Sequence, residues 1–213
     1  MNDFEKQVAV EYNSRFIKYG AQPKSSLWFS RERQNIRFDT IIYLIKKSSV
    51  PRHFSINDIG CGYGGFLSRL NANFGQYQFC YTGFDLASSP IEYCETIYRQ
   101  KGVKFFCGSK PIEKADYSVM SGTFNYAPNL TVKSWKEYLF ANLKSVWNMT
   151  KKSMIFNLMI AEEAKITRQC ISFIEKEAVV KYCQKNFGDT HYHFSSKLPQ
   201  ELTFCVDRRR KSS

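Results

Sequence analysis

The apolar positions of this chain follow two periods in turn, that of an amphipathic helix and that of a buried or half-buried strand. Spacings of three and four predict helices over residues 3–19, 64–74, 131–149 and 166–186, one after Ser30, and one capped by Ser88 or Ser89. Short apolar or alternating runs predict strands over residues 54–59, 78–84, 103–107, 153–160, 190–194 and 201–207, and one from residue 115. Alternating strands and helices predict a single doubly wound α/β domain over residues 1–213, with a mostly parallel seven-stranded sheet and a C-terminal antiparallel hairpin.

One stretch, residues 56–67, combines a buried strand, a tight turn and the start of a helix. Its apolar run contains Asp58, and four glycines follow within the six residues 60–65. Glycine is required where the chain takes unusual dihedral angles and where a ligand must come closer to the backbone than a Cβ atom allows. We therefore expect a ligand at the carboxyl end of this strand.

Two classes of ligand fit this turn. Gly60, Gly62 and Gly65 have the G-x-G-x-x-G spacing of dinucleotide-binding folds. Asp58 favours another ligand, because a pyrophosphate gains nothing from a nearby carboxylate, whereas a carboxylate can anchor the N–H groups of the turn or meet an ammonium group. Residues 57–64 resemble the first motif of the class I S-adenosylmethionine-dependent methyltransferases, apolar-apolar-Asp-apolar-Gly-x-Gly-x-Gly. The late antiparallel strand pair also matches this family.

The resemblance implies an activity, a cofactor and several cofactor contacts. A class I methyltransferase binds S-adenosyl-L-methionine, transfers its methyl group and releases S-adenosyl-L-homocysteine. The first motif implies cofactor contacts from Asp58, Gly60, Cys61, Gly62, Tyr63 and Gly64. Residues 115–126 look like the fourth motif of the family, which implies that Ser121 and Gly122 lie beside the methionine part of the cofactor.

Asp85 ends the second predicted strand, about 20 positions after the last glycine, where an acidic side chain accepts hydrogen bonds from both ribose hydroxyls. Both classes of ligand contain such a ribose. In the resembled family Asp85 is that ligand and Leu86 flanks the adenine. Ser109 stands where family members often carry an aspartate for the adenine amino group, so the serine hydroxyl or backbone groups are expected to take that role.

The first 47 residues are expected to form a helical lid over the ligand site. A helix, a loop over residues 21–26 and the group Trp28, Gln34 and Arg37 precede the first core strand. One branch of bacterial methyltransferases carries a Trp, a Gln and an Arg-Phe pair at similar spacing. This resemblance implies that Trp28 belongs to the cofactor site and that Arg37 binds the carboxylate of the cofactor. The alternative is a static helix whose arginine faces solvent.

Composition agrees with a globular protein, since 43% of the 213 residues are apolar and 16% are aromatic. No apolar run reaches the roughly 18 residues of a membrane span, and the N-terminus lacks the apolar region of a secretory signal, so we expect a soluble cytoplasmic protein. Seven cysteines without a C-x-x-C pair predict reduced thiols. His191 and His193 share a face of one predicted strand, but the sequence offers no third ligand, so no metal site is expected.

The net charge of +12 suggests an acidic partner such as nucleic acid, an anionic metabolite or a phospholipid surface. Basic residues are nevertheless spread along the chain, with runs only at residues 151–152 and 208–211. Residues 124–128 also lack the Asn/Asp-Pro-Pro-aromatic sequence of methyltransferases that act on base or glutamine amines. We therefore expect a small-molecule acceptor, with a nucleic-acid methyltransferase and a non-catalytic cofactor-binding module as alternatives. Position alone suggests four residues on the acceptor side, Asn125, Tyr126, His191 and His193.

Overall fold

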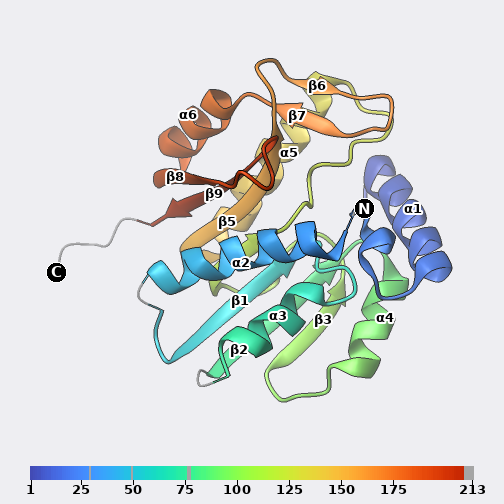
Figure 1. Cartoon of the computed structure of the whole chain (residues 1–213), viewed down its shortest axis with the longest axis vertical. Helices are drawn as coiled ribbons and strands as arrows, with labels where there is room; N and C mark the ends of the chain where they lie inside the picture. The colour runs from blue at the N-terminus through green and yellow to red at the C-terminus, as the bar shows by residue number, and fades with distance from the viewer. Residues whose placement is uncertain (29, 49, 76–77, 209–213) are drawn as a thin grey trace.

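In the computed structural model, which describes residues 1–28, 30–48, 50–75 and 78–208, helices enclose one sheet (Figure 1). The strands are β1 (His53–Ile59), β2 (Gln78–Asp85), β3 (Val103–Cys107), β4 (Ala115–Met120), β5 (Thr150–Ile160), β6 (Lys165–Ile166), β7 (Ser172–Ile174), β8 (Asp189–Phe194) and β9 (Glu201–Asp207). In the described chain they form one nine-stranded sheet of order β3-β2-β1-β4-β5-β7-β6, and β9 pairs with both β5 and β8. β3, β2, β1, β4 and β5 are parallel, whereas β9 is antiparallel to β5 and to β8.

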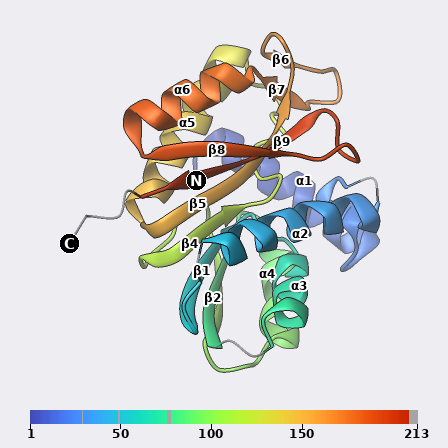
Figure 2. The ribbon, with the colours of Figure 1, turned by 60° about the vertical axis from the view of Figure 1, so that its left-hand side comes forward.

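The predicted mostly parallel sheet with a C-terminal hairpin is confirmed, and the short strands β6 and β7 are present in addition to the seven predicted strands. Strands β1 to β5 form its parallel part, and β8 and β9 form the C-terminal hairpin at its edge (Figure 2). The expectation of a helix over residues 166–186 is wrong in its first half, because β6 and β7 form a short hairpin there. β7 pairs with the last two residues of β5, and Cys170 in the turn has a φ of 61°, which an α-helix excludes.

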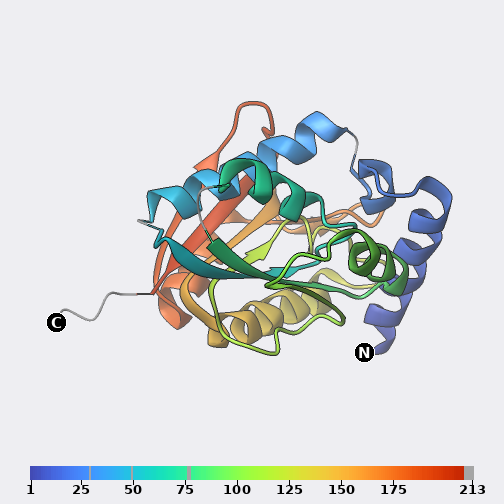
Figure 3. The ribbon, with the colours of Figure 1, turned by 90° about the horizontal axis from the view of Figure 1, so that it is seen from below.

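The helices lie in layers on both faces of the sheet (Figure 3). They are α1 (Asp3–Tyr19), α2 (Arg31–Lys47), α3 (Gly65–Asn73), α4 (Ser88–Ile97), α5 (Val132–Asn148) and α6 (Lys176–Asn186), with the short 3-10 helix η1 (Pro23–Ser26). Apolar side chains of α2, α3 and α4, among them Ile41 and Leu67, pack in one buried cluster. α5 and α6 contribute Leu139 and Val179 to the other. α1 lies beyond the carboxyl ends of the central strands, against α4 and η1.

The starts of α1, α2 and α5 follow local capping signals, and that of α4 does not. Ser30 caps α2 as predicted, since its hydroxyl accepts an N–H group of the first turn. α4 uses neither predicted cap, because its N-cap residue is Ala87 and no side chain of its own caps it. The N–H of Ser89 instead donates to Oδ1 of Asn13 in α1 over 2.9 Å. The start of α4 therefore depends on a tertiary contact with α1, which local sequence does not reveal.

α2 belongs to the buried core, so only part of the predicted lid over residues 1–47 lies over the sheet end. Ile41 and Ile45 of α2 are fully buried. Arg37, with 4% of its surface exposed, forms a bidentate ion pair with Glu201 of β9, its Nε lying 2.6 and 2.8 Å from the two carboxylate oxygens. Asn157 of β5 donates a further hydrogen bond to Glu201. This pair fixes α2 to β9, in the antiparallel part of the sheet.

Replacement of Arg37 by leucine is expected to lower the free energy of unfolding by roughly 3–5 kcal/mol, because it leaves Glu201 as a buried carboxylate without a counter-charge. The double variant Arg37→Leu with Glu201→Leu should recover most of that loss. Chemical denaturation of the three proteins measures both effects. Equal losses in the single and double variants would mean that lost packing, rather than an unpaired charge, causes the destabilisation.

Candidate active site

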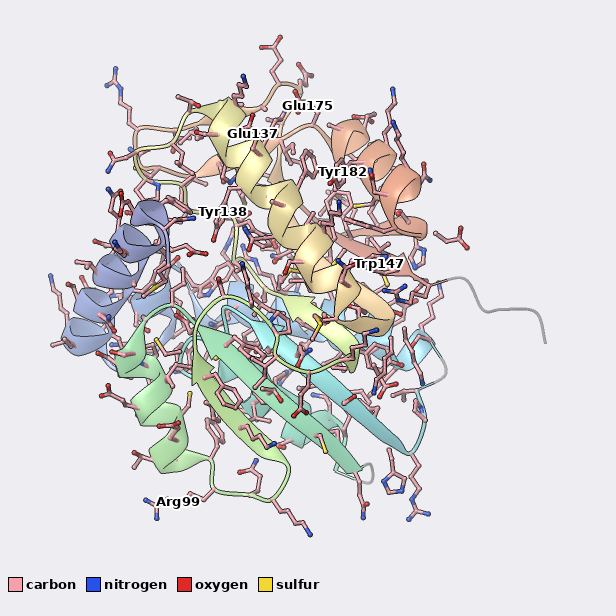
Figure 4. The ribbon with its side chains drawn as sticks, turned by 180° about the vertical axis from the view of Figure 1, so that it is seen from behind. Arg99, Glu137, Tyr138, Trp147, Glu175 and Tyr182 are labelled. Carbon is pink, nitrogen blue, oxygen red and sulfur yellow. The ribbon has the colours of Figure 1, made fainter. Side chains whose placement is uncertain are left out.

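A cavity lies at the carboxyl ends of β1, β2 and β4, next to α1. The turn after β1 forms one wall, and the loops after β2, β3 and β4 form others. Phe4, Val8 and Tyr12 of α1 face the cavity from the opposite side. Tyr138 of α5 points toward α1 (Figure 4), where its ring contacts that of Phe4 at a centroid distance of 4.8 Å. α1, which is distant in sequence from these loops, thus completes the enclosure of the cavity.

The turn after β1 has the backbone geometry that its glycines predict. Gly60, Gly62 and Gly64 have φ values of 78°, 52° and 78°, where an L side chain is strained. The N–H groups of Gly60 and Cys61 both donate to the carbonyl of Phe84, at 2.7 and 3.0 Å. Gly60, Cys61 and Gly62 line the cavity. The end of β2 therefore shapes the turn that follows β1.

Two further members of the motif have different environments. Tyr63 lines the cavity, and its hydroxyl donates to Oε1 of Gln34 in α2 over 2.6 Å. Gly64 is not among the residues that line the cavity. A Cβ atom at Gly64 would lie 2.5 Å from the ring of Tyr98, so glycine is needed there for close packing against the chain that leaves α4. Gly64 supports the turn without facing the space where a ligand would lie.

Asp85 joins the turn after β1 to the turn after β2. Its Oδ2 accepts the N–H of Gly62 over 2.8 Å, and its Oδ1 accepts the N–H of Ala87 over 2.9 Å. Burial raises the pKa of Asp85, and hydrogen bonds from backbone N–H groups oppose that rise. A carboxylate oxygen can accept more than one hydrogen bond, and Asp85 lines the cavity, so both oxygens can still accept from a ligand.

Asp58 is 1% exposed and also lines the cavity. Burial and, to a smaller extent, the charge of Asp85 raise its pKa to about 7, and a hydrogen bond of 2.5 Å from the Tyr81 hydroxyl opposes the rise. Of the two roles expected for Asp58, anchoring the turn is not observed, because the N–H groups of Gly60 and Gly62 donate elsewhere. A contact with a cationic ligand group stays a prediction.

Trp28 and Arg37 occupy different positions, although the sequence grouped them. Trp28 lines the cavity, as expected, and Arg37 does not. The Arg37 guanidinium lies 3.9 Å from the centroid of the Trp28 ring, and a Cβ atom at Gly122 would lie 2.2 Å from the same indole. For Arg37 to bind a cofactor carboxylate, its buried pair with Glu201 would have to open. In this arrangement Arg37 supports the indole that forms the cavity wall.

The remaining cofactor candidates, Leu86, Ser109, Ser121 and Gly122, all line the cavity. The Ser109 hydroxyl donates to Oε1 of Glu5 in α1 over 3.0 Å, so α1 reaches the loop after β3. Ser121 Oγ is buried and has no hydrogen-bond partner among the described residues. A buried hydroxyl without a partner is unfavourable. Ser121 is therefore able to gain a hydrogen bond from a ligand.

The four acceptor-side candidates separate in the structure. Tyr126 lines the cavity. Asn125 does not, and its side-chain oxygen accepts the N–H of Met159 over 3.3 Å. His191 and His193 are exposed on β8 and do not line the cavity. β8 pairs only with β9 in the described sheet, on the side of β5 that faces away from β1, so their position in the fold argues against a role in catalysis.

α1 contributes side chains to the cavity that sequence reasoning did not single out as site residues. Phe4, Val8 and Tyr12 recur every four residues, so the spacing that predicts the helix also gives the stripe that faces the cavity. The Tyr12 ring lies 6.1 Å from that of Tyr126 and perpendicular to it. Asp85 is close enough for its charge to raise the pKa of Tyr12, in addition to burial. The stripe was visible in the sequence, but the surface that it faces was not.

Two solved structures share this arrangement over nearly the whole chain. One is magnesium protoporphyrin IX methyltransferase from Synechocystis PCC 6803 with bound S-adenosylmethionine, with a TM-score of 0.66, 12% identity and coverage of 98% of this chain and 99% of that chain. The other is a Leishmania major S-adenosylmethionine-dependent methyltransferase, with a TM-score of 0.70, 12% identity and coverage of 98% and 87%. The chain has the class I S-adenosylmethionine-dependent methyltransferase fold.

Similarity in sequence is weaker than similarity in fold. The chain is 27% identical over 137 residues to the Mycobacterium tuberculosis protein named "Putative methyltransferase Rv1506c", which covers 63% of this chain and 81% of that protein. No protein-family model matches the chain. Among the described residues, no helix is both long enough and apolar enough to cross a membrane.

Asp58 is expected to make the stability of the protein depend on pH. Its pKa rises from 3.8 to about 7 on folding, so the folded state binds the extra proton between these values. The stabilising effect of the neutral carboxyl is complete below the unfolded pKa and is lost as pH rises through about 7. The free energy of unfolding should therefore fall by on the order of 4 kcal/mol between about pH 4 and about pH 8 through this group.

The measurement is chemical denaturation at several pH values for the wild type and for Asp58→Asn, whose profile should lack this part of the slope. Glu32→Gln, which changes an exposed carboxylate of α2, is the matched control and should keep the wild-type slope. Parallel profiles for the wild type and Asp58→Asn would show that Asp58 ionises normally in the folded protein.

Proposed function

We propose that this chain transfers a methyl group from S-adenosylmethionine to a small organic acceptor. The observation that supports this most is the lining of the cavity, where Asp58 and Asp85 stand among aromatic rings and no described lining residue is a lysine or arginine. Carboxylates suit a cationic ligand with a ribose, and an aromatic wall suits an apolar or flat acceptor. The Synechocystis relative is named for a small acceptor, magnesium protoporphyrin IX.

The residues of the cavity fit the cofactor. Asp85 would accept hydrogen bonds from the ribose hydroxyls, with Leu86 and Ser109 beside the adenine. Asp58 would face the ammonium group, and the unpartnered hydroxyl of Ser121 would gain a hydrogen bond from the methionine part. When bound, the cofactor supplies a methyl group on a positively charged sulfur, which is a strong leaving group.

The protein then has to position the acceptor and exclude water. Burial raises the pKa of the Tyr12 and Tyr126 hydroxyls, so both stay protonated at neutral pH and can donate hydrogen bonds to an acceptor. They are therefore positioning residues and not bases. Phe4 and Val8 cover the cavity with apolar surface. A base is needed only for an acceptor that is protonated at the working pH.

A nucleic-acid methyltransferase is the second candidate, and the net charge of +12 favours it. The two basic runs give it less support. Arg208 donates to the carbonyls of Trp147 and Thr150 and lies 4.3 Å from the centroid of the Trp147 ring. Lys152 lies 3.8 Å from a carboxylate oxygen of Asp116. These cations have partners within the fold, and residues 209–211 lie outside the described residues.

Calorimetry tests the cofactor. S-adenosylmethionine and S-adenosylhomocysteine should bind, and NAD should not. Asp85→Ala should weaken binding by roughly 2–4 kcal/mol, because it removes charge-assisted hydrogen bonds to two hydroxyls. Asp39→Ala, at an exposed position of α2, serves as the control with wild-type affinity. Preference for NAD would overturn the proposed function, and wild-type affinity in folded Asp85→Ala would overturn the ribose role alone.

An acceptor screen tests the reaction. Purified protein with S-adenosylmethionine is offered small hydroxylated, amine and thiol compounds in one set of reactions and RNA in another, and release of S-adenosylhomocysteine is measured. Turnover with a small acceptor supports the proposal. Turnover with RNA alone would favour the second candidate, and tight cofactor binding without turnover in either set would favour a non-catalytic module.

We further propose that α1 and η1 act as a lid over the bound cofactor. Hydrogen exchange on the intact protein should slow in residues 3–19 as well as in the turn over residues 60–65 when S-adenosylhomocysteine is added, because the ligand would contact both. α6, which does not line the cavity, provides the internal control and should not respond. Protection confined to the turn would rule out the lid.

A further inference from the structure

A second cluster of chemically reactive side chains lies on the C-terminal hairpin, away from the cavity residues. His191 of β8 and Cys205 of β9 are directly opposite each other in the antiparallel pair. Asp207 follows Cys205 by two residues, so both side chains lie on the same face of β9. One ligand atom from each of the three side chains lies within 4.8 Å of the other two. The sequence shows no such group, because strand pairing brings the three residues together.

Each of the two oxygens of Asp207 lies at about the distance from one neighbouring ligand atom that a tetrahedral zinc ion requires. His191 Nε2 lies 3.3 Å from Asp207 Oδ2, and Cys205 Sγ lies 3.6 Å from Asp207 Oδ1. Tetrahedral zinc with ordinary bond lengths separates nitrogen from oxygen by roughly 3.4 Å and sulfur from oxygen by roughly 3.6 Å. A single ion that binds one oxygen of Asp207 therefore requires a rotation of that carboxylate, within a cluster whose ligand atoms already lie within 4.8 Å of one another.

The surroundings also suit a metal ion. Ser153 of β5, opposite Asp207 in the sheet, donates a hydrogen bond of 2.5 Å to Asp207 Oδ1, which orients the carboxylate in the way that outer-shell groups orient metal ligands. The Cys205 side chain is buried, whereas the side chains of His191 and Asp207 are 53% and 34% exposed. The cluster is thus open to solvent on one side. A fourth ligand can come from water.

We propose that His191, Cys205 and Asp207 bind one zinc ion, with a water molecule as the fourth ligand. Thiolate and imidazole ligands favour zinc over magnesium or calcium, which prefer oxygen. Burial and Asp207 raise the pKa of the Cys205 thiol, so each zinc ion must displace one proton from sulfur to the buffer. The ion would link β8 to β9 and hold the terminal hairpin together. His193 takes no part, because its ring lies beside Tyr43 of α2.

Cobalt(II) is the probe for this site, because a tetrahedral cobalt thiolate gives a sulfur-to-metal charge-transfer band and strong visible bands. Full-length protein is treated with a chelator under reducing conditions and titrated with cobalt. One equivalent of cobalt should bind per chain and give both the charge-transfer band and the visible bands. Added zinc should displace the cobalt and abolish these bands. Cys205→Ser should lose the charge-transfer band, whereas Cys80→Ser, which changes an exposed thiol of β2, should keep it.

Two further variants separate coordination from folding. His191→Gln changes an exposed side chain, so it should fold normally and lose more than about 100-fold in cobalt affinity, whereas Ser153→Ala should lose about 10-fold. The proposal is overturned if cobalt gives no charge-transfer band in the wild type, if the band persists in Cys205→Ser, or if folded His191→Gln binds cobalt with wild-type affinity. The readout is independent of methyl transfer.

Discussion

The hydrogen bonds that Asp85 accepts from Gly62 and Ala87 are the contacts on which the shape of the cavity depends. They join the turn after β1 to the turn after β2, and the Phe84 carbonyl adds the N–H groups of Gly60 and Cys61. The sheet continues from β1 in both directions, to β2 on one side and to β4 on the other. In open α/β sheets a crevice forms where the loops after neighbouring strands diverge to opposite sides of the sheet. Here the carboxylate of Asp85 fixes one side of that crevice.

Buried charge is compensated where α2 packs on the sheet, but not at the cavity. The Arg37 guanidinium is matched by Glu201, with Asn157 completing the hydrogen bonds, so the framework charge is compensated. Asp58 and Asp85 instead lie close together, and the pKa of each is raised by burial. A protein that places uncompensated carboxylates around a cavity loses stability there, which is common where a ligand supplies the missing charge.

Features set by neighbouring residues could be predicted from the sequence, and features set by distant pairing could not. The glycine turn, the strand before Asp85 and the Ser30 cap depend on local backbone chemistry, and all three are found. Asp85 was recognised because its separation in sequence from the glycines can be read directly from the chain. The pairing of Arg37 with Glu201 spans 164 residues, and that of Ser109 with Glu5 spans 104, so neither leaves a periodic signal.

The same reasoning explains one expectation that was wrong and the unforeseen position of two histidines. Residues 166–174 are rich in β-branched and aromatic residues, which favour strands, and β7 pairs with the end of β5, so the helix begins only at Lys176. His191 and His193 were grouped with the acceptor side because the sequence gives no order for the last two strands. That order, with β9 between β5 and β8, moves both histidines to the outer edge and brings Cys205 to His191.

The capping of α4 by Asn13 makes the position of α1 part of the folding of its neighbour. If α1 moves away as the proposed lid, the N–H of Ser89 in the first turn of α4 loses its acceptor, whereas the N–H of Ala87 stays bound to Asp85. Opening of the proposed lid would then fray the start of α4, and closing would restore it. Ligand exchange and fraying of α4 would then share one free-energy barrier. A mutation that destabilises the start of α4 would therefore change the rates at which ligands enter and leave the cavity, although the mutated residue contacts no ligand.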